Sequence, residues 1–98
     1  MAWLEGKAAV VTGGSRGIGR AIAEALLERG ASVTIGSATP ARVEQAVAEL
    51  EAKAPGRVRG VVCDVRDPDQ CRDLIDGAAA AFGRLDVLVN NAGVGIFG

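Results

Sequence analysis

Short apolar runs alternate along this chain with longer segments whose apolar residues recur at helical spacing. Four short runs predict buried strands, over residues 7–12, 32–36, 58–63 and 87–90. Three longer segments predict helices, over residues 16–29, from Pro40 to the Pro55-Gly56 break, and from Pro68 to Gly83. Strands and helices that alternate at this spacing favour right-handed crossovers and a parallel sheet.

The expected helix ends carry their own signals. Thr39 is expected to cap the second helix, with Pro40 at the first helical position. Asp67 is expected to cap the third, with Gln70 placed as in a capping box. Gly30 is a plausible stop for the first helix. The expected apolar stripe of that first helix is Ile18, Ile22, Ala25 and Leu26.

The fold class that follows is α/β, a Rossmann-like parallel sheet with the element order βαβαβαβ. The expected strand order is 3-2-1-4, with the sheet ending after its fourth strand. No linker interrupts the alternation, so residues 1–98 are expected to form one domain, an incomplete member of its fold class. The fourth strand then becomes an apolar edge, which predicts marginal stability or association through that edge.

Composition narrows the possible partners. The net charge of −1 provides no basic field for nucleic acid and no polybasic patch for a membrane. No signal peptide is recognised, because Glu5 interrupts the opening residues before any apolar core. Cys63 and Cys71 do not make a disulfide framework, and without histidine a metal site is not expected. A reducing cytoplasm fits these features.

A glycine-rich stretch, residues 12–19, lies between the first strand and the first helix. Gly13 allows a sharp turn, Gly17 lets a phosphate approach the backbone, and Gly19 lets the helix pack closely on the sheet. The free N–H groups and the positive end of the helix face an anion. Glycines also mark ordinary turns, but the strand before and the helix after favour a pyrophosphate site.

The spacing Thr-Gly-x-x-x-Gly-x-Gly, together with Asn90-Asn91-Ala92-Gly93, resembles the short-chain dehydrogenase/reductase family, notably NADPH-using ketoacyl-reductase-like members. The resemblance covers the chain from Gly6-Lys7 onward. It implies an oxidoreductase that interconverts a small carbonyl compound and an alcohol, with a nicotinamide dinucleotide as cofactor and a homo-oligomeric assembly when complete. Family catalysis uses a Ser and a Tyr-x-x-x-Lys pair beyond the second motif. This chain has no tyrosine, so no catalytic residue is assigned.

The resemblance also implies which residues meet the dinucleotide. The residues expected to hold the pyrophosphate and its adjoining ribose are Gly13, Ser15, Arg16, Gly17, Ile18 and Gly19. Asp64 is expected to accept a hydrogen bond from the adenine amino group, and Val65 to pack near the base, although Asp64 also fits a solvated turn. Asn90, Ala92 and Gly93 are expected to lie along the cofactor, although they also fit a plain turn that closes a strand.

The end of the second strand bears on the choice between NADP and NAD. A carboxylate there would bond the ribose 2′-hydroxyl and repel a 2′-phosphate, but the corresponding residue is Ser37. Ser37 and Thr39 resemble the small hydroxyl residues that receive the phosphate in ketoacyl reductases, and Arg16 is a nearby cation. NADP(H) is therefore favoured, with NAD(H) possible because Ala38 stands where many NADP-using members have arginine.

Two other functions remain open. The chain could be a non-catalytic module that binds NADP(H), which would bind the cofactor without turnover. A methyltransferase on the same kind of sheet is a further possibility, but that class prefers an acid where Ser37 stands.

Overall fold

The computed structural model describes residues 3–15 and 17–91. Its four strands are β1 (Ala8–Thr12), β2 (Ser32–Ser37), β3 (Val58–Val62) and β4 (Val87–Asn90). Its three helices are α1 (Gly17–Glu28), α2 (Pro40–Lys53) and α3 (Pro68–Phe82). The alternation predicted from the apolar pattern is confirmed, with boundaries that differ by one or two residues.

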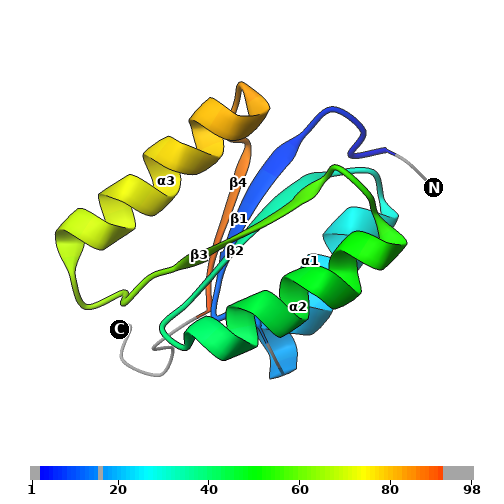
Figure 1. Cartoon of the computed structure of the whole chain (residues 1–98). Helices are drawn as coiled ribbons and strands as arrows, with labels where there is room; N and C mark the ends of the chain where they lie inside the picture. Colours follow the sequence, from blue (N-terminus) through cyan, green and yellow to red (C-terminus); the bar gives the residue numbers. More distant parts are fainter. Residues whose placement is uncertain (1–2, 16, 92–98) are drawn as a thin grey trace.

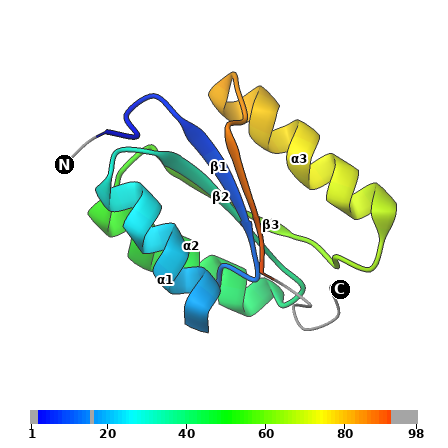
Figure 2. The same ribbon diagram turned by 180° about the vertical axis from the view of Figure 1, so that it is seen from behind.

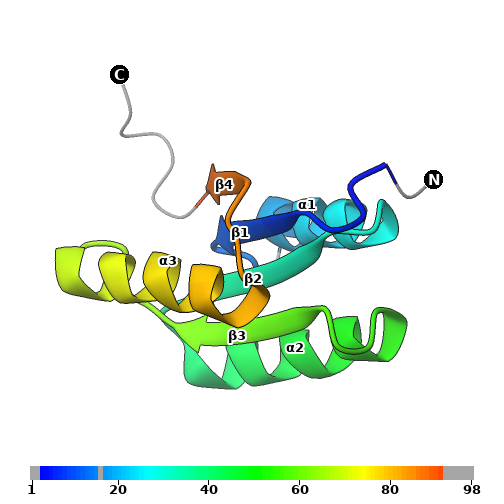
Figure 3. The same ribbon diagram turned by 90° about the horizontal axis from the view of Figure 1, so that it is seen from above.

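The strands form one parallel sheet in the order β3-β2-β1-β4, as expected. Helices α1 and α2 cover one face of this sheet and α3 covers the other (Figures 1 and 2). Figure 3 shows β3 and β4 at opposite edges. The chain builds the sheet outward from β1 through β2 to β3, and α3 then returns it to the other side of β1, where β4 lies. The order in which strands are added therefore reverses between β1 and β4, although all four strands are parallel.

Two apolar clusters hold the layers together. The larger lies between the sheet and the pair α1 and α2, and the smaller lies under α3 around Val10, Cys63, Leu74 and Ala78. Strand β1 is buried along its whole length, as its apolar sequence predicts for a central parallel strand. Strand β4 is less well covered, and the Leu88 side chain is 52% exposed there.

The helix ends confirm some sequence signals and correct two. The capping box expected at Gln70 does not form, because the Gln70 side-chain oxygen accepts from the Asp64 N–H and the Asp67 N–H donates to the Asp64 carbonyl. Helix α1 stops where the N–H groups of Gly30 and Ala31 bond to the carbonyls of Leu27 and Leu26. Asp67 caps α3, because its carboxylate accepts hydrogen bonds from the N–H groups of Asp69 and Gln70. Thr39 stands at the start of α2, but its side chain makes no capping bond. The side-chain cap predicted at Thr39 is therefore wrong.

The buried face of α1 also differs from the predicted stripe. Its buried residues are Gly19, Ala23 and Leu27, with Ile22 and Leu26 packed beside them. Ile18 is 73% exposed and lies outside the core. The first half of the helix is buried through two small residues, Gly19 and Ala23, and Gly19 packs directly against the backbone of Gly13. The first turn therefore turns a glycine, and not Ile18, toward the rest of the fold.

Candidate functional site

The site is built on the carboxyl edge of the sheet. In the strand register, Thr12 of β1 stands beside Gly36 of β2 on one side and Asn90 of β4 on the other. The loops that follow these strands therefore start at one level and meet at one edge. This edge includes the point between β1 and β4 where the order reverses, and open α/β sheets bind ligands at such a point.

The glycine turn takes a backbone that other residues rarely adopt. Gly13 and Gly17 have φ angles of 67° and 61°, in the left-handed region. The Gly13 N–H donates to the Gly36 carbonyl at 2.7 Å, which joins the turn to β2. Apart from its neighbours in the chain, no atom of the described residues lies within 4 Å of where a Gly17 side chain would begin, so that side of the Gly17 backbone is open toward the other described residues.

Gly19 has a different role, because it lets α1 approach the turn. A Cβ atom at this position would collide with the Gly13 carbonyl oxygen and lie 2.7 Å from the Gly13 carbonyl carbon. It would also lie 2.8 Å from the side-chain nitrogen of Asn91. The helix, the turn and the segment after β4 therefore converge at a point where only hydrogen fits.

A groove of about 430 Å³ opens over this turn. We call it the turn groove; it is lined by Gly13, Ser15, Gly17, Ile18, Ser37, Arg42 and Asn91. Among the described residues, its lining includes the Arg42 guanidinium and no carboxylate, and the groove lies at the N-terminus of α1. Hydroxyl, amide and guanidinium donors in this arrangement suit an anionic ligand.

Two serines form the floor between the turn and β2. Ser15 is buried, and its hydroxyl donates to the Ser37 hydroxyl across 3.2 Å. The Thr39 N–H approaches the same Ser37 oxygen at 3.5 Å. The end of β2 therefore presents a neutral hydroxyl toward the turn groove.

Thr12 joins β1 to the end of β4. Its hydroxyl donates to the Asn90 side-chain oxygen at 3.0 Å and accepts from the Asn91 N–H at 2.9 Å. These contacts hold the Asn90-Asn91 backbone against the glycine turn. Thr12, the first residue of the glycine-rich stretch, therefore holds that stretch against the Asn90-Asn91 segment.

The end of β3 is held by α3. The Asp64 N–H donates to the Gln70 side-chain oxygen at 2.8 Å, and the Asp64 carboxylate accepts from the Arg66 guanidinium at 3.0 and 2.9 Å. The Arg66 side chain, and then its backbone N–H, lower the pKa of Asp64 to about 2. Asp64 is therefore ionised at neutral pH, and one of its oxygens accepts only a single bond.

A second cavity, of about 130 Å³, lies on the α3 side of the same edge. We call it the edge cavity; it is lined by Thr12, Val65, Cys71, Leu74, Ile75, Leu88 and Asn90. The lining is mainly apolar, with polar atoms from Thr12 and Asn90. Such a surface suits one face of a flat, partly apolar ring.

The structure brings most of the predicted site residues to this edge. Gly13, Ser15, Gly17, Ile18 and Ser37 line the turn groove, and Val65 and Asn90 line the edge cavity. Asp64 directly precedes Val65 in the chain but lines neither the turn groove nor the edge cavity, and Thr39 reaches the site through its backbone N–H. Arg16, Ala92 and Gly93 lie outside the described residues.

Three residues at the site were not among those predicted. Thr12 and Asn91 belong to the two motifs, but their contact depends on the pairing of β1 with β4. Arg42 lines the turn groove from the first turn of α2. Its only sequence signal was its position soon after the second strand, which identifies the correct end of the sheet but not the direction of the side chain.

Residues 3–15 and 17–91 contain no group of three or more acidic, cysteine or histidine side chains that could hold a metal ion. No helix among them is long and apolar enough to cross a membrane.

An open parallel sheet with an anion-binding glycine turn at its switch point defines a nucleotide-binding α/β domain. Residues 7–98 match the family model described as short chain dehydrogenase, and the chain belongs to that family. Members are oxidoreductases that bind nicotinamide dinucleotides, so the family resemblance stated from the two motifs is confirmed.

The similar proteins are longer than this chain. An uncharacterized oxidoreductase of Methylorubrum extorquens is 50% identical over 96% of this chain and 38% of its own length. The 3-oxoacyl-[acyl-carrier-protein] reductase of Escherichia coli is 49% identical over 93% of this chain and 36% of its own length. The solved structure of L-sorbose reductase from Gluconobacter frateurii with NADPH and L-sorbose is 39% identical, with a TM-score of 0.85 over 92% of this chain and 34% of that one. The chain therefore spans less than two fifths of these relatives.

Proposed function

We propose that this chain is the NADP(H)-binding portion of a short-chain oxidoreductase that interconverts a small carbonyl compound and an alcohol. Residues 1–98 form its NAD(P)-binding domain in this proposal. The choice of cofactor rests on Ser37 at the end of β2, where the side chain is a neutral hydroxyl and not a carboxylate. Its oxygen lies 3.2 Å from the Ser15 hydroxyl oxygen. An acid at this point would repel a phosphate on the ribose, and a serine instead offers it a hydrogen bond.

Each predicted residue takes a role along the dinucleotide. The glycine turn holds the pyrophosphate and the adjoining ribose, through Gly13, Ser15, Arg16, Gly17, Ile18 and Gly19. Ser37 and Thr39 receive the 2′-phosphate, Thr39 through its backbone N–H. The Asp64 carboxylate accepts a hydrogen bond from the adenine amino group while Val65 packs on the ring. Three residues, Asn90, Ala92 and Gly93, lie along the cofactor toward its nicotinamide end.

The lining of the turn groove supports this assignment. Its described residues carry no negative charge, and its donors come from the turn, the end of β2 and α2. The similar L-sorbose reductase was solved with NADPH. NAD(H) remains the competing cofactor, because Ala38 provides no cation at the end of β2.

When bound, the nicotinamide ring supplies a hydride to, or takes one from, the carbon of the substrate. The residues of this chain bind and orient the dinucleotide, and none is assigned a proton transfer. The whole protein is proposed to act as a homo-oligomer. Cys63 and Cys71 are both free thiols, which favours a reducing cytoplasm.

The test compares equilibrium binding of NADPH and NADH to the chain and to Ser37→Asp, with Ser37→Ala as the neutral control. The wild-type chain should bind NADPH more tightly. The new carboxylate should reverse this preference, because two like charges at about 4 Å repel by roughly 4 kcal/mol at a surface-like dielectric constant of 20. Equal affinity of the wild-type chain for both cofactors, or preference for NADH, would refute the NADP(H) assignment.

A further inference from the structure

Both cysteines of the chain lie where β3 passes into α3. Cys63 directly follows β3, and its N–H donates to the Ser37 carbonyl at 2.9 Å. Cys71 lies in the first turn of α3, where its N–H donates to the Asp67 carbonyl at 3.1 Å. Cys63 is buried in the smaller apolar cluster, and Cys71 packs against that same cluster. The fold therefore places the two thiols together on the α3 side of the sheet.

Hydrogen bonds fold the connection between the two cysteines, residues 64–70, back on itself. The Asp64 N–H donates to the Gln70 side-chain oxygen at 2.8 Å, so the chain neighbours of the two cysteines are joined. The Asp67 N–H donates to the Asp64 carbonyl at 3.0 Å, which closes a turn inside the connection. The Cys71 thiol donates to the Val65 carbonyl at 3.4 Å. These bonds hold the start of α3 against the end of β3.

The two thiols have different surroundings. Cys63 is 2% exposed, and burial, followed by the nearby Cys71 thiol, raises the pKa of Cys63. Cys71 is half-buried and lines the edge cavity, so a small reagent can reach its sulfur. An accessible thiol beside a protected one suits a reaction in which the first is oxidised and the second then resolves it into a disulfide.

We propose that Cys63 and Cys71 form a modification site, at which a hydroperoxide closes a reversible disulfide. The Cys71 thiolate attacks the peroxide and breaks the O–O bond, which gives a sulfenic acid on Cys71 and an alcohol that takes up the Cys71 proton. The Cys63 sulfur then attacks the Cys71 sulfur, forms the S–S bond and displaces the hydroxyl, which leaves with the Cys63 proton as water. The two thiols lose two electrons, and the hydroperoxide gains them.

The disulfide acts on the adenine side of the site. Asp64 and Val65, the residues proposed to contact the base, lie on the connection that the new bond closes. The bond removes the proton that the Cys71 thiol donates to the Val65 carbonyl, and it draws the Cys71 sulfur toward Cys63 and away from the edge cavity. Oxidation should therefore weaken binding of the base, and this consequence rests on the proposed function.

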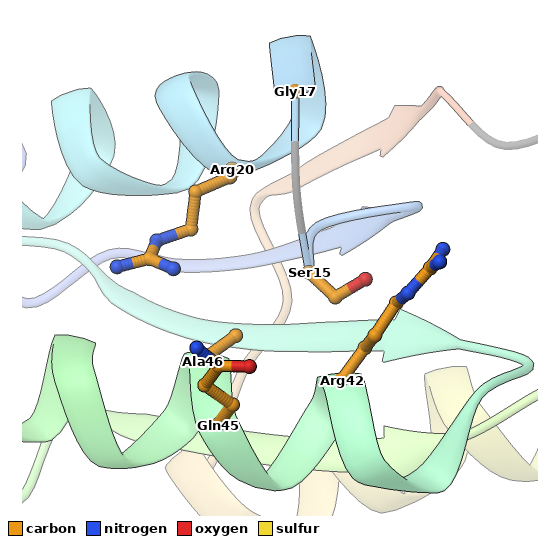
Figure 4. A pocket seen from close by; sticks show the side chains of 6 residues that line it. All are labelled: Ser15, Gly17, Arg20, Arg42, Gln45 and Ala46. Atoms are coloured by element: carbon orange, nitrogen blue, oxygen red, sulfur yellow. The ribbon is translucent and has the colours of Figure 1, made fainter.

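The phosphate side of the site lies apart from the cysteines. A groove of about 420 Å³ runs between α1 and α2 beside the glycine turn, and it is lined by Ser15, Gly17, Arg20, Arg42, Gln45 and Ala46 (Figure 4). Helices α1 and α2 cover the face of the sheet opposite α3 (Figures 1 and 2). None of these six residues belongs to the segment from Cys63 to Cys71, so oxidation should leave a ligand held through phosphate alone unaffected.

The experiment treats the reduced chain with hydrogen peroxide and follows its intact mass and its free thiols. The wild-type chain should lose two hydrogen atoms and both thiols, remain a single chain on a non-reducing gel, and recover both thiols in dithiothreitol. Cys71→Ser should form no bond within the chain, because the sequence has no third cysteine. Cys63→Ala keeps the accessible thiol, and it should take up oxygen at Cys71 instead.

Calorimetry with adenosine 5′-monophosphate and with pyrophosphate measures the consequence for the site. The oxidised chain should bind the monophosphate about 2- to 10-fold more weakly, as expected for one lost hydrogen bond, and should bind pyrophosphate as before. Peroxide-treated Cys71→Ser should keep its affinity for both probes.

The outcomes separate this inference from the proposed function. A peroxide-treated wild-type chain that keeps both thiols, or forms disulfides only between chains, overturns the modification site whatever the chain binds. A disulfide within the chain that leaves affinity for the monophosphate unchanged, or weakens both probes equally, overturns its effect on the base. A reduced chain that binds neither probe overturns the proposed function, whereas the mass and the thiol count still decide whether the disulfide forms.

Discussion

Replacement of Gly19 by alanine tests the packing on which the site depends. The added methyl group would enter the point where α1 meets the Gly13 carbonyl and the Asn91 side chain. Its distance to the Gly13 carbonyl carbon would be 2.7 Å, against an ordinary carbon–carbon contact of about 3.5 Å. The turn would have to retreat by about 0.8 Å. Because the obstacle is backbone, the strain cannot be relieved by a change of rotamer.

The expected cost is about 1–3 kcal/mol in the free energy of unfolding, the range for an overpacked site. Gly77→Ala in α3 is the matched control, because it is also a change from glycine to alanine inside a helix. A Cβ at Gly77 would lie 3.4 Å from the end of the Arg59 side chain, which can move. This control should gain about 0.5–1 kcal/mol from the better helix propensity of alanine.

Urea unfolding followed by circular dichroism measures both variants. The two unfolding free energies should differ by about 1.5–4 kcal/mol, with Gly19→Ala the less stable. Gly19→Ala should also weaken dinucleotide binding, since the displaced turn no longer presents its N–H groups correctly. A Gly19→Ala chain as stable as the wild type, beside a stabilised Gly77→Ala, would refute the close-packing argument.

Three further predictions concern stability and association. The Arg84 side chain, and then the Ala8 N–H, lower the pKa of Asp86 from 3.8 to about 2. The ionised carboxylate therefore stabilises the fold above about pH 4, and this contribution is lost as the pH falls toward 2. The stability gap between wild type and Asp86→Asn in urea should therefore close over that range, and a gap that is independent of pH would contradict the assignment. Asp67→Ala should cost about 0.5–2 kcal/mol in urea unfolding through its lost helix cap, whereas Thr39→Ala, whose side chain makes no cap, should stay within about 0.5 kcal/mol. Leu88→Lys should reduce self-association in sedimentation velocity, because it places a charge on the exposed apolar edge; a wild-type chain that is a sharp monomer with a cooperative melt would argue against this edge as a contact.

The helix caps show how far local sequence signals reach. Asp67 and Thr39 both precede a proline at the first helical position, and both have extended backbone at the cap. Asp67 bonds to the first turn of its helix, but the Thr39 side chain does not. Residue type permits a cap, whereas the path of the incoming loop decides whether the side-chain oxygen reaches the free N–H groups.

Ile18 shows a similar division on α1. Helical spacing correctly predicts that Ile22 and Leu26 pack toward the sheet, and the same spacing wrongly includes Ile18. Spacing defines a stripe on an isolated helix. The depth to which each turn enters the core depends on what lies opposite, and opposite the first turn lies the glycine backbone.

By itself, the sequence determined the alternation of strands and helices, the parallel sheet and the glycine turn at the end of β1. These features follow from apolar periodicity and from backbone conformations that only glycine adopts easily, which are properties of short segments. Only the tertiary structure decided that Thr12 contacts Asn90 and Asn91, and that Arg42 lines the turn groove. Such contacts join residues that are remote in sequence, and they depend on strand register and on how each helix is turned about its axis, which no short segment specifies.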